Sequence, residues 1–193
     1  MITSMINEEF LSNESIIVAI DVDDLLFDRL KQILQAGFHT VEINTTDTQL
    51  LEKVIHDFPQ LRIGAGNITN TQQLENVYQA GVRFATSPGF LPAIAQTASI
   101  YSMNYLPGIS TLSEAMQVLA LGYQQARPYP ANLSFCTLIN KCFPILRLFP
   151  AEVEWDDAEH YLNLPAVTAI SILNPEKNQL KNALELSVYT DSI

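Results

Sequence analysis

The fold is constrained most by a regular alternation of short apolar runs and longer amphipathic segments. The runs are rich in Val, Ile and Leu and predict strands at Ile16–Ile20, Thr40–Ile43, Leu61–Ile63, Val82–Thr86, Met103–Leu106, Gln125–Tyr129, Ile145–Phe149 and Val167–Ile172. The segments between them have the apolar spacing of helices, and one strand–helix unit takes about two dozen residues. A terminal helix is predicted near Lys177–Leu186.

Glycines and a capping motif support these boundaries. Gly37, Gly81 and Gly122 each follow a predicted helix and precede a strand, where a left-handed residue ends a helix favourably. Thr111 and Glu114 have the spacing of a capping box at the start of the fifth helix.

Strict alternation predicts a parallel sheet, and eight units predict that it closes. The expected fold is α/β, a single (β/α)8 TIM barrel over residues 15–193, preceded by an N-terminal extension or helix of residues 1–14. An open doubly wound sheet is the alternative. Its G-x-G-x-x-G turn is absent after the first strand, where the chain reads Asp21-Val22-Asp23-Asp24.

Composition excludes several classes of partner. The chain is 48% hydrophobic, enough for a core, and its formal charge is −11. Lys and Arg do not cluster, so nucleic acid and anionic membrane surfaces are not expected partners. No basic region precedes an apolar run at the amino terminus, and no apolar stretch approaches the about 20 residues that span a bilayer. The expected location is cytoplasmic.

The cysteines and histidines do not predict a metal site. Cys136 and Cys142 fall on one predicted helix and are interpreted as buried small hydrophobic residues. His39 precedes the second strand, at the end opposite the expected active site, whereas His56 and His160 fall on outer helices. Neither a metal nor a cofactor is implied.

Four motifs stand at the carboxyl ends of successive predicted strands, where such barrels place their active sites. They are Val41-Glu42-Ile43, Gly64-Ala65-Gly66-Asn67-Ile68, Ser87-Pro88-Gly89 and Pro107-Gly108-Ile109-Ser110-Thr111. In this order and spacing, over roughly residues 16–172, the chain resembles the 2-keto-3-deoxy-6-phosphogluconate / 4-hydroxy-2-oxoglutarate (KDPG/KHG) aldolase family. The resemblance implies a class I aldolase barrel, a homotrimer, a 2-oxo acid substrate and a catalytic glutamate at Glu42.

The resemblance fails at the Schiff-base lysine. The family carries it in K-x-F-P-A-E at the end of the sixth strand, and this place is held by Arg127 in Arg127-Pro128-Tyr129-Pro130. The similar run Arg147–Glu152 lies one unit later and also offers arginine. A guanidinium stays protonated and is a poor nucleophile. The five lysines all fall on predicted helices: Lys31, Lys53, Lys141, Lys177 and Lys181.

Phosphate binding also departs from the family. Its P-T-G-G-I segment is replaced by Pro150-Ala151-Glu152-Val153-Glu154, which places carboxylates where a phosphate should bind. Its glycine-serine segment is replaced by Ile170-Ser171-Ile172-Leu173, and its substrate-carboxylate arginine by Thr46.

The candidate catalytic residues are Glu42 and Arg127, which stands at the Schiff-base lysine position. Glu42 is either a general acid or base or the ionic partner of Arg127, and Arg127 alternatively binds a carboxylate. The candidate substrate-binding residues are Thr46, Asn67, Ser87, Pro88, Pro107 and Tyr129. Asn67 and Ser87 are alternatively caps of the following helices.

The leading hypothesis is a degenerate member of this family that has lost Schiff-base catalysis. It would bind a small 2-oxo acid or carboxylate, or serve as a protein-interaction scaffold. The alternative is an active aldolase or lyase that cleaves a non-phosphorylated 2-keto-hydroxy acid to pyruvate, with Glu42 as the acid or base.

Overall fold

The computed structural model describes residues 14–181 of the 193-residue chain. The predicted N-terminal extension or helix of residues 1–14 therefore lies, apart from Glu14, outside the described residues. Residues 182–193 of the predicted barrel domain also lie outside them.

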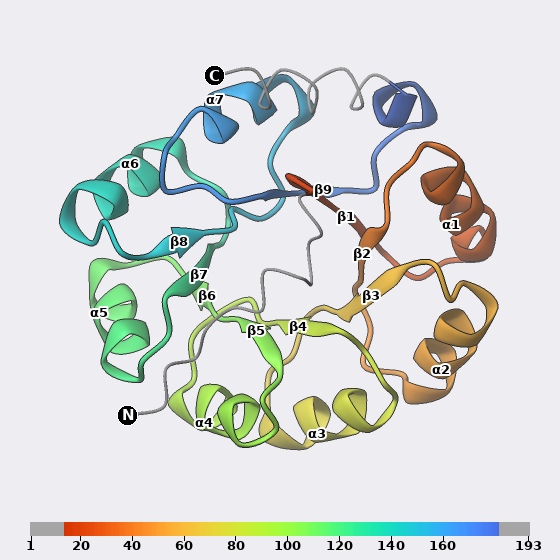
Figure 1. The fold of residues 1–193 in the computed structure, drawn as a ribbon, viewed down its shortest axis with the longest axis horizontal. Coiled ribbons are helices and arrows are strands. Elements are labelled where there is room, and N and C mark those ends of the chain that lie inside the picture. The colour runs from red at the N-terminus through yellow and green to blue at the C-terminus, as the bar shows by residue number, and fades with distance from the viewer. Residues whose placement is uncertain (1–13, 182–193) are drawn as a thin grey trace.

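Strands and helices alternate along the described chain as predicted, except that the predicted fifth strand is followed directly by a short additional strand at Gly108–Ile109 (Figure 1). The strands are β1 (Ile16–Ile20), β2 (Thr40–Ile43), β3 (Arg62–Ala65), β4 (Phe84–Thr86), β5 (Asn104–Leu106), β6 (Gly108–Ile109), β7 (Gln125–Pro128), β8 (Arg147–Leu148) and β9 (Ile170–Leu173). The helices are α1 (Leu26–Gln35), α2 (Thr48–Asp57), α3 (Thr71–Gln79), α4 (Pro92–Ile100), α5 (Leu112–Ala120), α6 (Leu133–Cys142), the 3-10 turn η2 (Trp155–Asp157) and α7 (Ala158–Leu162). Residues 177–181 begin the predicted terminal helix.

All strand pairs are parallel, and the helices lie outside the strands (Figure 1). The strands form a six-stranded sheet in the order β5-β4-β3-β2-β1-β9 and a three-stranded sheet, β6-β7-β8. This order follows the chain without the reversal that a doubly wound sheet requires, so that alternative is wrong.

The predicted single closed sheet is instead divided. Pro107 lies between β5 and β6, and its missing N–H interrupts the ladder there. At the other division, β8 is two residues long, and the isolated bridge Leu148↔Val167 joins it to the segment just before β9. The structure therefore has a curled, barrel-like parallel arrangement made of two sheets.

The predicted helix ends are confirmed. Gly37, Gly81 and Gly122 have φ of 86°, 88° and 85°, a conformation that a side chain would oppose. Thr111 and Glu114 form the predicted capping box of α5, with both reciprocal hydrogen bonds present. These signals depend on neighbouring residues only, which is why the sequence places them well.

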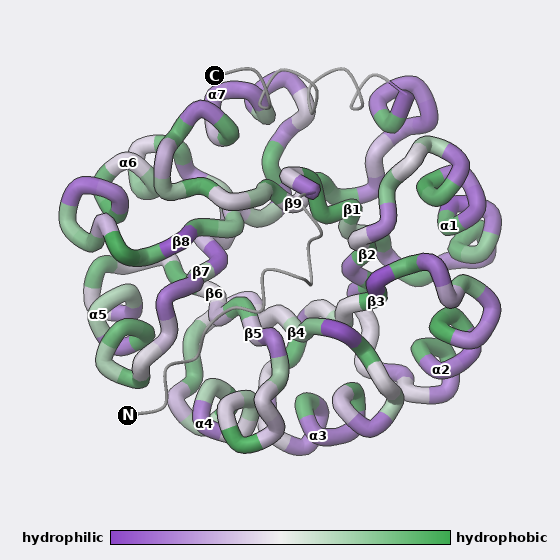
Figure 2. The backbone as a smooth tube through the Cα atoms, viewed as in Figure 1, coloured by the Kyte–Doolittle hydropathy of each residue, from purple (hydrophilic) through white to green (hydrophobic). Residues whose placement is uncertain are grey.

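Two apolar clusters hold the elements in place. The larger one lies between strands and helices, and α1 and α2 turn their hydrophilic residues away from the strands (Figure 2). The smaller one, on the inner side of the strands, consists of Ile17, Phe84, Leu106, Phe149 and Ala169. The Phe84 ring fills the space that a side chain at Gly64 would need. This inner cluster closes the interior below the candidate site.

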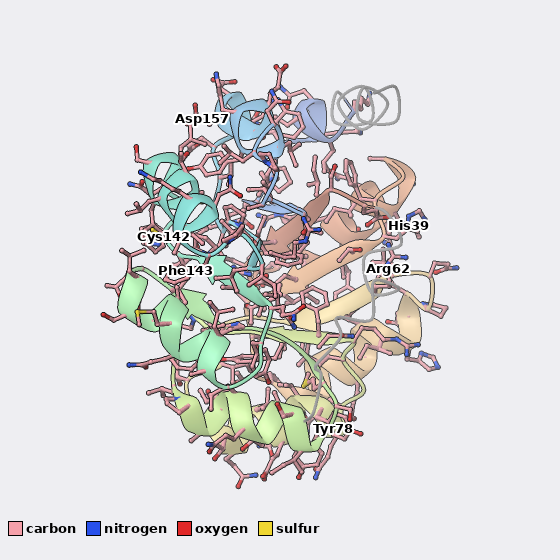
Figure 3. The ribbon with its side chains drawn as sticks, turned by 60° about the vertical axis from the view of Figure 1, so that its left-hand side comes forward. His39, Arg62, Tyr78, Cys142, Phe143 and Asp157 are labelled. Atoms are coloured by element: carbon pink, nitrogen blue, oxygen red, sulfur yellow. The ribbon has the colours of Figure 1, made fainter. Side chains whose placement is uncertain are left out.

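A polar cluster lies at the amino-terminal ends of β2 and β3. The inner apolar cluster separates it from the candidate site. Glu14 accepts hydrogen bonds from the Thr40 N–H at 2.8 Å and contacts His39 Nδ1 and Arg62 Nη2, each at 3.0 Å. His39 and Arg62 lie side by side in Figure 3. His39 thus occupies the predicted position before the second strand, away from the candidate site.

Candidate functional site

Glu42 is a fully buried carboxylate on β2, with 0% of its surface exposed. Its neighbours Val41 and Ile43 belong to the outer core, so Glu42 points to the inner side. Thr86 Oγ1 donates a hydrogen bond to Glu42 Oε1 at 2.9 Å, and Arg127 Nη1 donates to Glu42 Oε2. The carboxylate is therefore held from two other strands.

Arg127 lies on β7 and is 5% exposed. Its backbone N–H donates to the Pro107 carbonyl at 2.8 Å, which fixes the residue beside Gly108 on β6. The ion pair expected between Arg127 and Glu42 is present. Within the part of the chain that the structure describes, it is the only hydrogen bond of the guanidinium, so most of its N–H donors are not engaged by the described residues.

Ser171 on β9 belongs to the same interior layer of polar side chains as Glu42, Thr86 and Arg127. Ala169 belongs to the inner cluster, so Ser171, two residues further on, points inward as well. Ser171 is 2% exposed, and among residues 14–181 no atom hydrogen-bonds its Oγ. Glu42, Thr86, Arg127 and Ser171 thus come from β2, β4, β7 and β9, the alternate-strand pattern of an interior layer.

Gly66 makes room for the buried carboxylate. A Cβ at this position would lie 2.7 Å from Glu42 Oε1 and would overlap Asn44 Oδ1. The φ of Gly66 is not positive, so this glycine serves close approach rather than a left-handed turn. The glycine of the Gly64–Ile68 motif therefore fixes the position of Glu42.

The Ser87–Gly89 loop is held by its own serine. Ser87 is buried, its Oγ donates to the Gly89 carbonyl at 2.7 Å, and it shares a hydrogen bond with the Tyr105 hydroxyl. Burial raises the pKa of Tyr105. A Cβ at Gly108 would lie 2.5 Å from the Ser87 carbonyl oxygen, so this loop packs directly on β6.

The capping alternative for Asn67 and Ser87 is wrong. The N-cap of α3 is Asn70, and that of α4 is Leu91. Asn67 is exposed and has a φ of 62°, whereas Ser87 turns back to its own loop. The sequence offered several polar residues near each helix start, and only the backbone conformation selects among them.

Tyr129 follows β7 and is half-buried. Its hydroxyl donates to Glu152 Oε1 at 3.3 Å. Burial raises the pKa of Tyr129, and the negative charge of Glu152 raises it further. Glu152 itself has a φ of 58°, which is unusual for a residue other than glycine.

A hydrogen-bond network spans the carboxyl ends of β1, β2 and β9. Asp21 accepts from Asn44 Nδ2 and from Asn174 Nδ2, each at 2.8 Å. Asn174 Oδ1 accepts from the Asp21 N–H at 3.0 Å and from Arg29 Nη1 at 3.2 Å. Sequence reasoning missed this network and Ser171. Inward alternation from Ala169 is the signal that could have identified Ser171.

The other predicted site residues are placed less centrally. Thr46 is half-buried after β2, and Pro88 is exposed. Pro107 is buried and contributes its carbonyl to Arg127. The structure thus joins Glu42 to Arg127 and brings Pro107 to Arg127 through the backbone. Within residues 14–181, neither Thr46 nor Asn67 nor Pro88 shares a hydrogen bond or ion pair with Glu42 or the Arg127 side chain.

All five lysines are exposed and lie in helical segments. They are Lys31 on α1, Lys53 on α2, Lys141 on α6, and Lys177 and Lys181 in the last described helix. Lys31 and Lys53 pair with acidic residues of their own helices. None stands at a strand end.

One prediction about the cysteines is wrong. Both lie on α6, but Cys136 is buried and Cys142 is exposed, because Cys142 ends the helix on its outer side (Figure 3). In the region 14–181, no three His, Cys, Asp or Glu side chains are grouped to hold a metal ion. No helix of that region is long and apolar enough to cross a membrane.

Comparisons with known proteins agree with this geometry. A sequence profile described as KDPG and KHG aldolase matches residues 8–182. A 2-dehydro-3-deoxy-phosphogluconate aldolase of Pseudoalteromonas atlantica is 32% identical over 107 residues, which cover 54% of this chain and 50% of that protein. The chain spans about half the length of the curated relatives it matches.

Two solved structures share the fold. The KDPG aldolase of Legionella pneumophila, with pyruvate captured as a covalent carbinolamine, has a TM-score of 0.78 at 24% identity and covers 93% of this chain and 95% of its own. The 2-keto-3-deoxy-6-phosphogluconate aldolase of Zymomonas mobilis ZM4, with 3-phosphoglycerate, has a TM-score of 0.81 at 17% identity and covers 93% of each chain.

Proposed function

Because this chain belongs to the KDPG and KHG aldolase family, we propose that it is a divergent member that binds a small 2-oxo acid or carboxylate without forming a Schiff base. One observation carries the proposal. Arg127, at the position where the family resemblance expects the lysine, is buried and paired with Glu42. A guanidinium does not attack a ketone, but it suits a carboxylate.

The lysines support the loss of covalent chemistry. A Schiff-base lysine needs an unprotonated amine beside the substrate carbonyl, and burial is what usually provides one. All five lysines of this chain are exposed on helices. The amine that attacks the substrate therefore has no counterpart near Glu42.

Arg127 and the relatives support the class of ligand. The guanidinium gives one hydrogen bond to Glu42 and keeps further donors. The Legionella relative captures pyruvate, a 2-oxo acid. We infer that Arg127, near the carboxyl ends of the strands, binds the same class of small acid. Charge and hydrogen bonds would hold the acid there instead of a covalent bond.

A phosphorylated substrate is not supported by the loops after β8 and β9. The backbone amides there already donate within the protein: Val153 to the Ser171 carbonyl at 2.9 Å, Asn174 to the Ala19 carbonyl at 2.7 Å and Glu176 to Gln179 Oε1 at 2.8 Å. Pro175 has no N–H to offer. The carboxylates of Asp21 and Glu152 add like charge that repels a phosphate.

A lyase that cleaves a non-phosphorylated 2-keto-hydroxy acid to pyruvate is the second candidate. It is favoured by one observation, the retained carboxylate of Glu42 at the end of β2. In that case Glu42 moves the proton and Arg127 stabilises the oxyanion. The buried ion pair favours the binding function, because both carboxylate oxygens of Glu42 already accept hydrogen bonds, one from Thr86 and one from Arg127.

We also infer that the two sheets act as one (β/α)8 barrel of residues 15–193. At one division between the sheets, the hydrogen bond from the Arg127 N–H to the Pro107 carbonyl supports continuity of the barrel. At the other, the Thr168 and Ser171 N–H groups donate to the Leu148 and Pro150 carbonyls. A cytoplasmic homotrimer is part of the proposal, and exposed apolar side chains on α4 and α5 support self-association.

Borohydride reduction in the presence of pyruvate tests the proposal. We expect no covalent adduct on the full-length chain by mass spectrometry, and saturable, reversible binding of pyruvate by calorimetry. Arg127→Lys is the matched control, in which an adduct at position 127 is expected. An adduct on the unmodified chain, or pyruvate released from 4-hydroxy-2-oxoglutarate, would favour the lyase. Failure to bind any small 2-oxo acid or carboxylate would reject the binding function.

A further inference from the structure

We infer that Ser171 is a second binding residue of this site, which together with Arg127 holds the carboxylate of a small 2-oxo monocarboxylic acid. The inference rests on the proposed function. The four family motifs at the strand ends do not include Ser171.

The hydroxyl of Ser171 is buried without a protein partner. The residue is 2% exposed, and no donor or acceptor of the described chain reaches its Oγ. A buried hydroxyl without a hydrogen bond costs about 1–3 kcal/mol, so such groups usually have a partner. A bound ligand atom supplies one here.

Ser171 lies at the level of Arg127. The Phe149 N–H donates to the Ala126 carbonyl and the Ala151 N–H to the Pro128 carbonyl, so Phe149 stands beside Arg127, one residue before Pro150. The Ser171 N–H in turn donates to the Pro150 carbonyl at 2.8 Å. One strand, β8, lies between the strands of Arg127 and Ser171, and inward side chains of alternate strands meet in one layer.

Gln125 shows that an unpartnered buried oxygen is not enough. Gln125 Oε1 also lacks a partner among the described residues, and Gln125 is 3% exposed. It lies two residues before Arg127 on β7, at the depth of the inner apolar cluster of Phe84 and Phe149. A ligand that enters from the carboxyl ends of the strands meets the layer of Ser171 before it meets Gln125.

The charged side chains near the carboxyl ends of the strands determine which 2-oxo acid binds, by its size and its charge. Arg127 and Ser171 both donate to a carboxylate, while Glu42 fixes the guanidinium from the other side. Asp21 and Glu152 stand further out, near the strand ends. They repel a second carboxylate, so pyruvate fits this site better than 2-oxoglutarate does.

Calorimetry on the full-length chain tests the inference with pyruvate and 2-oxoglutarate as probes. Ser171→Ala should weaken pyruvate binding about ten-fold, because one hydrogen bond to a charged group is lost. Its melting temperature should stay within about a degree or two of the unmodified chain or rise, because an unpartnered hydroxyl is removed. Ser134→Ala, an exposed serine on α6, is the matched control and should bind as the unmodified chain does.

The outcomes separate the two proposals. If the unmodified chain binds neither probe nor any other small carboxylate, the proposed function fails. If it binds pyruvate and Ser171→Ala binds it equally well, the hydroxyl is satisfied by water and only the role of Ser171 is overturned. Tighter binding of 2-oxoglutarate than of pyruvate would overturn the choice of a monocarboxylate.

Discussion

Arg127 Nη1 donates a hydrogen bond to Glu42 Oε2, joining β7 to β2 across 85 positions of the sequence. Both side chains are almost completely buried. Each charge is compensated by the other, and Thr86 adds a third strand to the contact. A guanidinium paired with Glu42 therefore stands where the family resemblance expects the reactive amine.

Removing one charge of this pair should destabilise the fold. Arg127→Met leaves Glu42 buried and uncompensated, and such losses cost about 3–5 kcal/mol. The free energy of unfolding in urea measures this. The double variant Arg127→Met/Glu42→Leu should recover a large part of the loss, since no isolated charge remains. Equal stability of the single variant and the unmodified chain would mean that the pair is not buried as described.

Gly66→Ala should displace Glu42. The added Cβ would lie 2.7 Å from Glu42 Oε1, so the carboxylate must move away from Arg127. We expect a loss of about 1–3 kcal/mol in the free energy of unfolding. Gly89→Ala is the matched control, because its Cβ meets no atom within 4 Å. Similar urea midpoints for the two variants would contradict this role of Gly66.

The capping box of α5 should give a pH-dependent stability. Partial burial acts to raise the pKa of Glu114, but hydrogen bonds from Ser110 and Thr111 outweigh it and lower the pKa. A carboxyl whose pKa is lower in the folded state than in the unfolded state stabilises the fold when the pH is above its unfolded pKa, near 4.5. This stabilisation is lost as the pH falls through the pKa of the folded state. The stability difference between the unmodified chain and Glu114→Gln should therefore shrink below about pH 4.5. A difference that grows on acidification would show the opposite sign.

The two cysteines should react at very different rates. Burial raises the pKa of the Cys136 thiol to about 11, whereas Cys142 is exposed. A thiol reagent should modify one cysteine of the folded chain quickly and the second only after unfolding. Peptide mapping should assign the fast site to Cys142, and Cys142→Ser should abolish it. Fast modification of Cys136 would indicate that α6 opens.

Self-association should involve α4 and α5, which are neighbours in Figure 1. Ile100 and Met116 are the most exposed large apolar side chains of the described residues, at 79% and 59%. Light scattering should give about three times the 21.5 kDa of one chain. Met116→Lys should lower this mass and Ser134→Lys should not. A monomeric unmodified chain would reject the trimer.

The sequence by itself determined the elements, because their signals are local. Strand and helix periodicity, the glycine at Gly122 and the Thr111 capping box each depend on residues within a few positions. The replacement of a lysine by Arg127 is likewise readable from the residues alone. It limits the chemistry before any contact is known, because a guanidinium is always charged.

Only the tertiary structure decided which side chains meet. The burial of Glu42 against Arg127 and the unpartnered hydroxyl of Ser171 depend on strand register over long stretches of chain. The exposure of Cys142 depends on how α6 packs against the rest of the fold, and the division into two sheets depends on which strands pair. Sequence patterns indicate the local conformational preference of each segment. The contacts and burial of these side chains arise only when segments distant in the sequence pack together and exclude water.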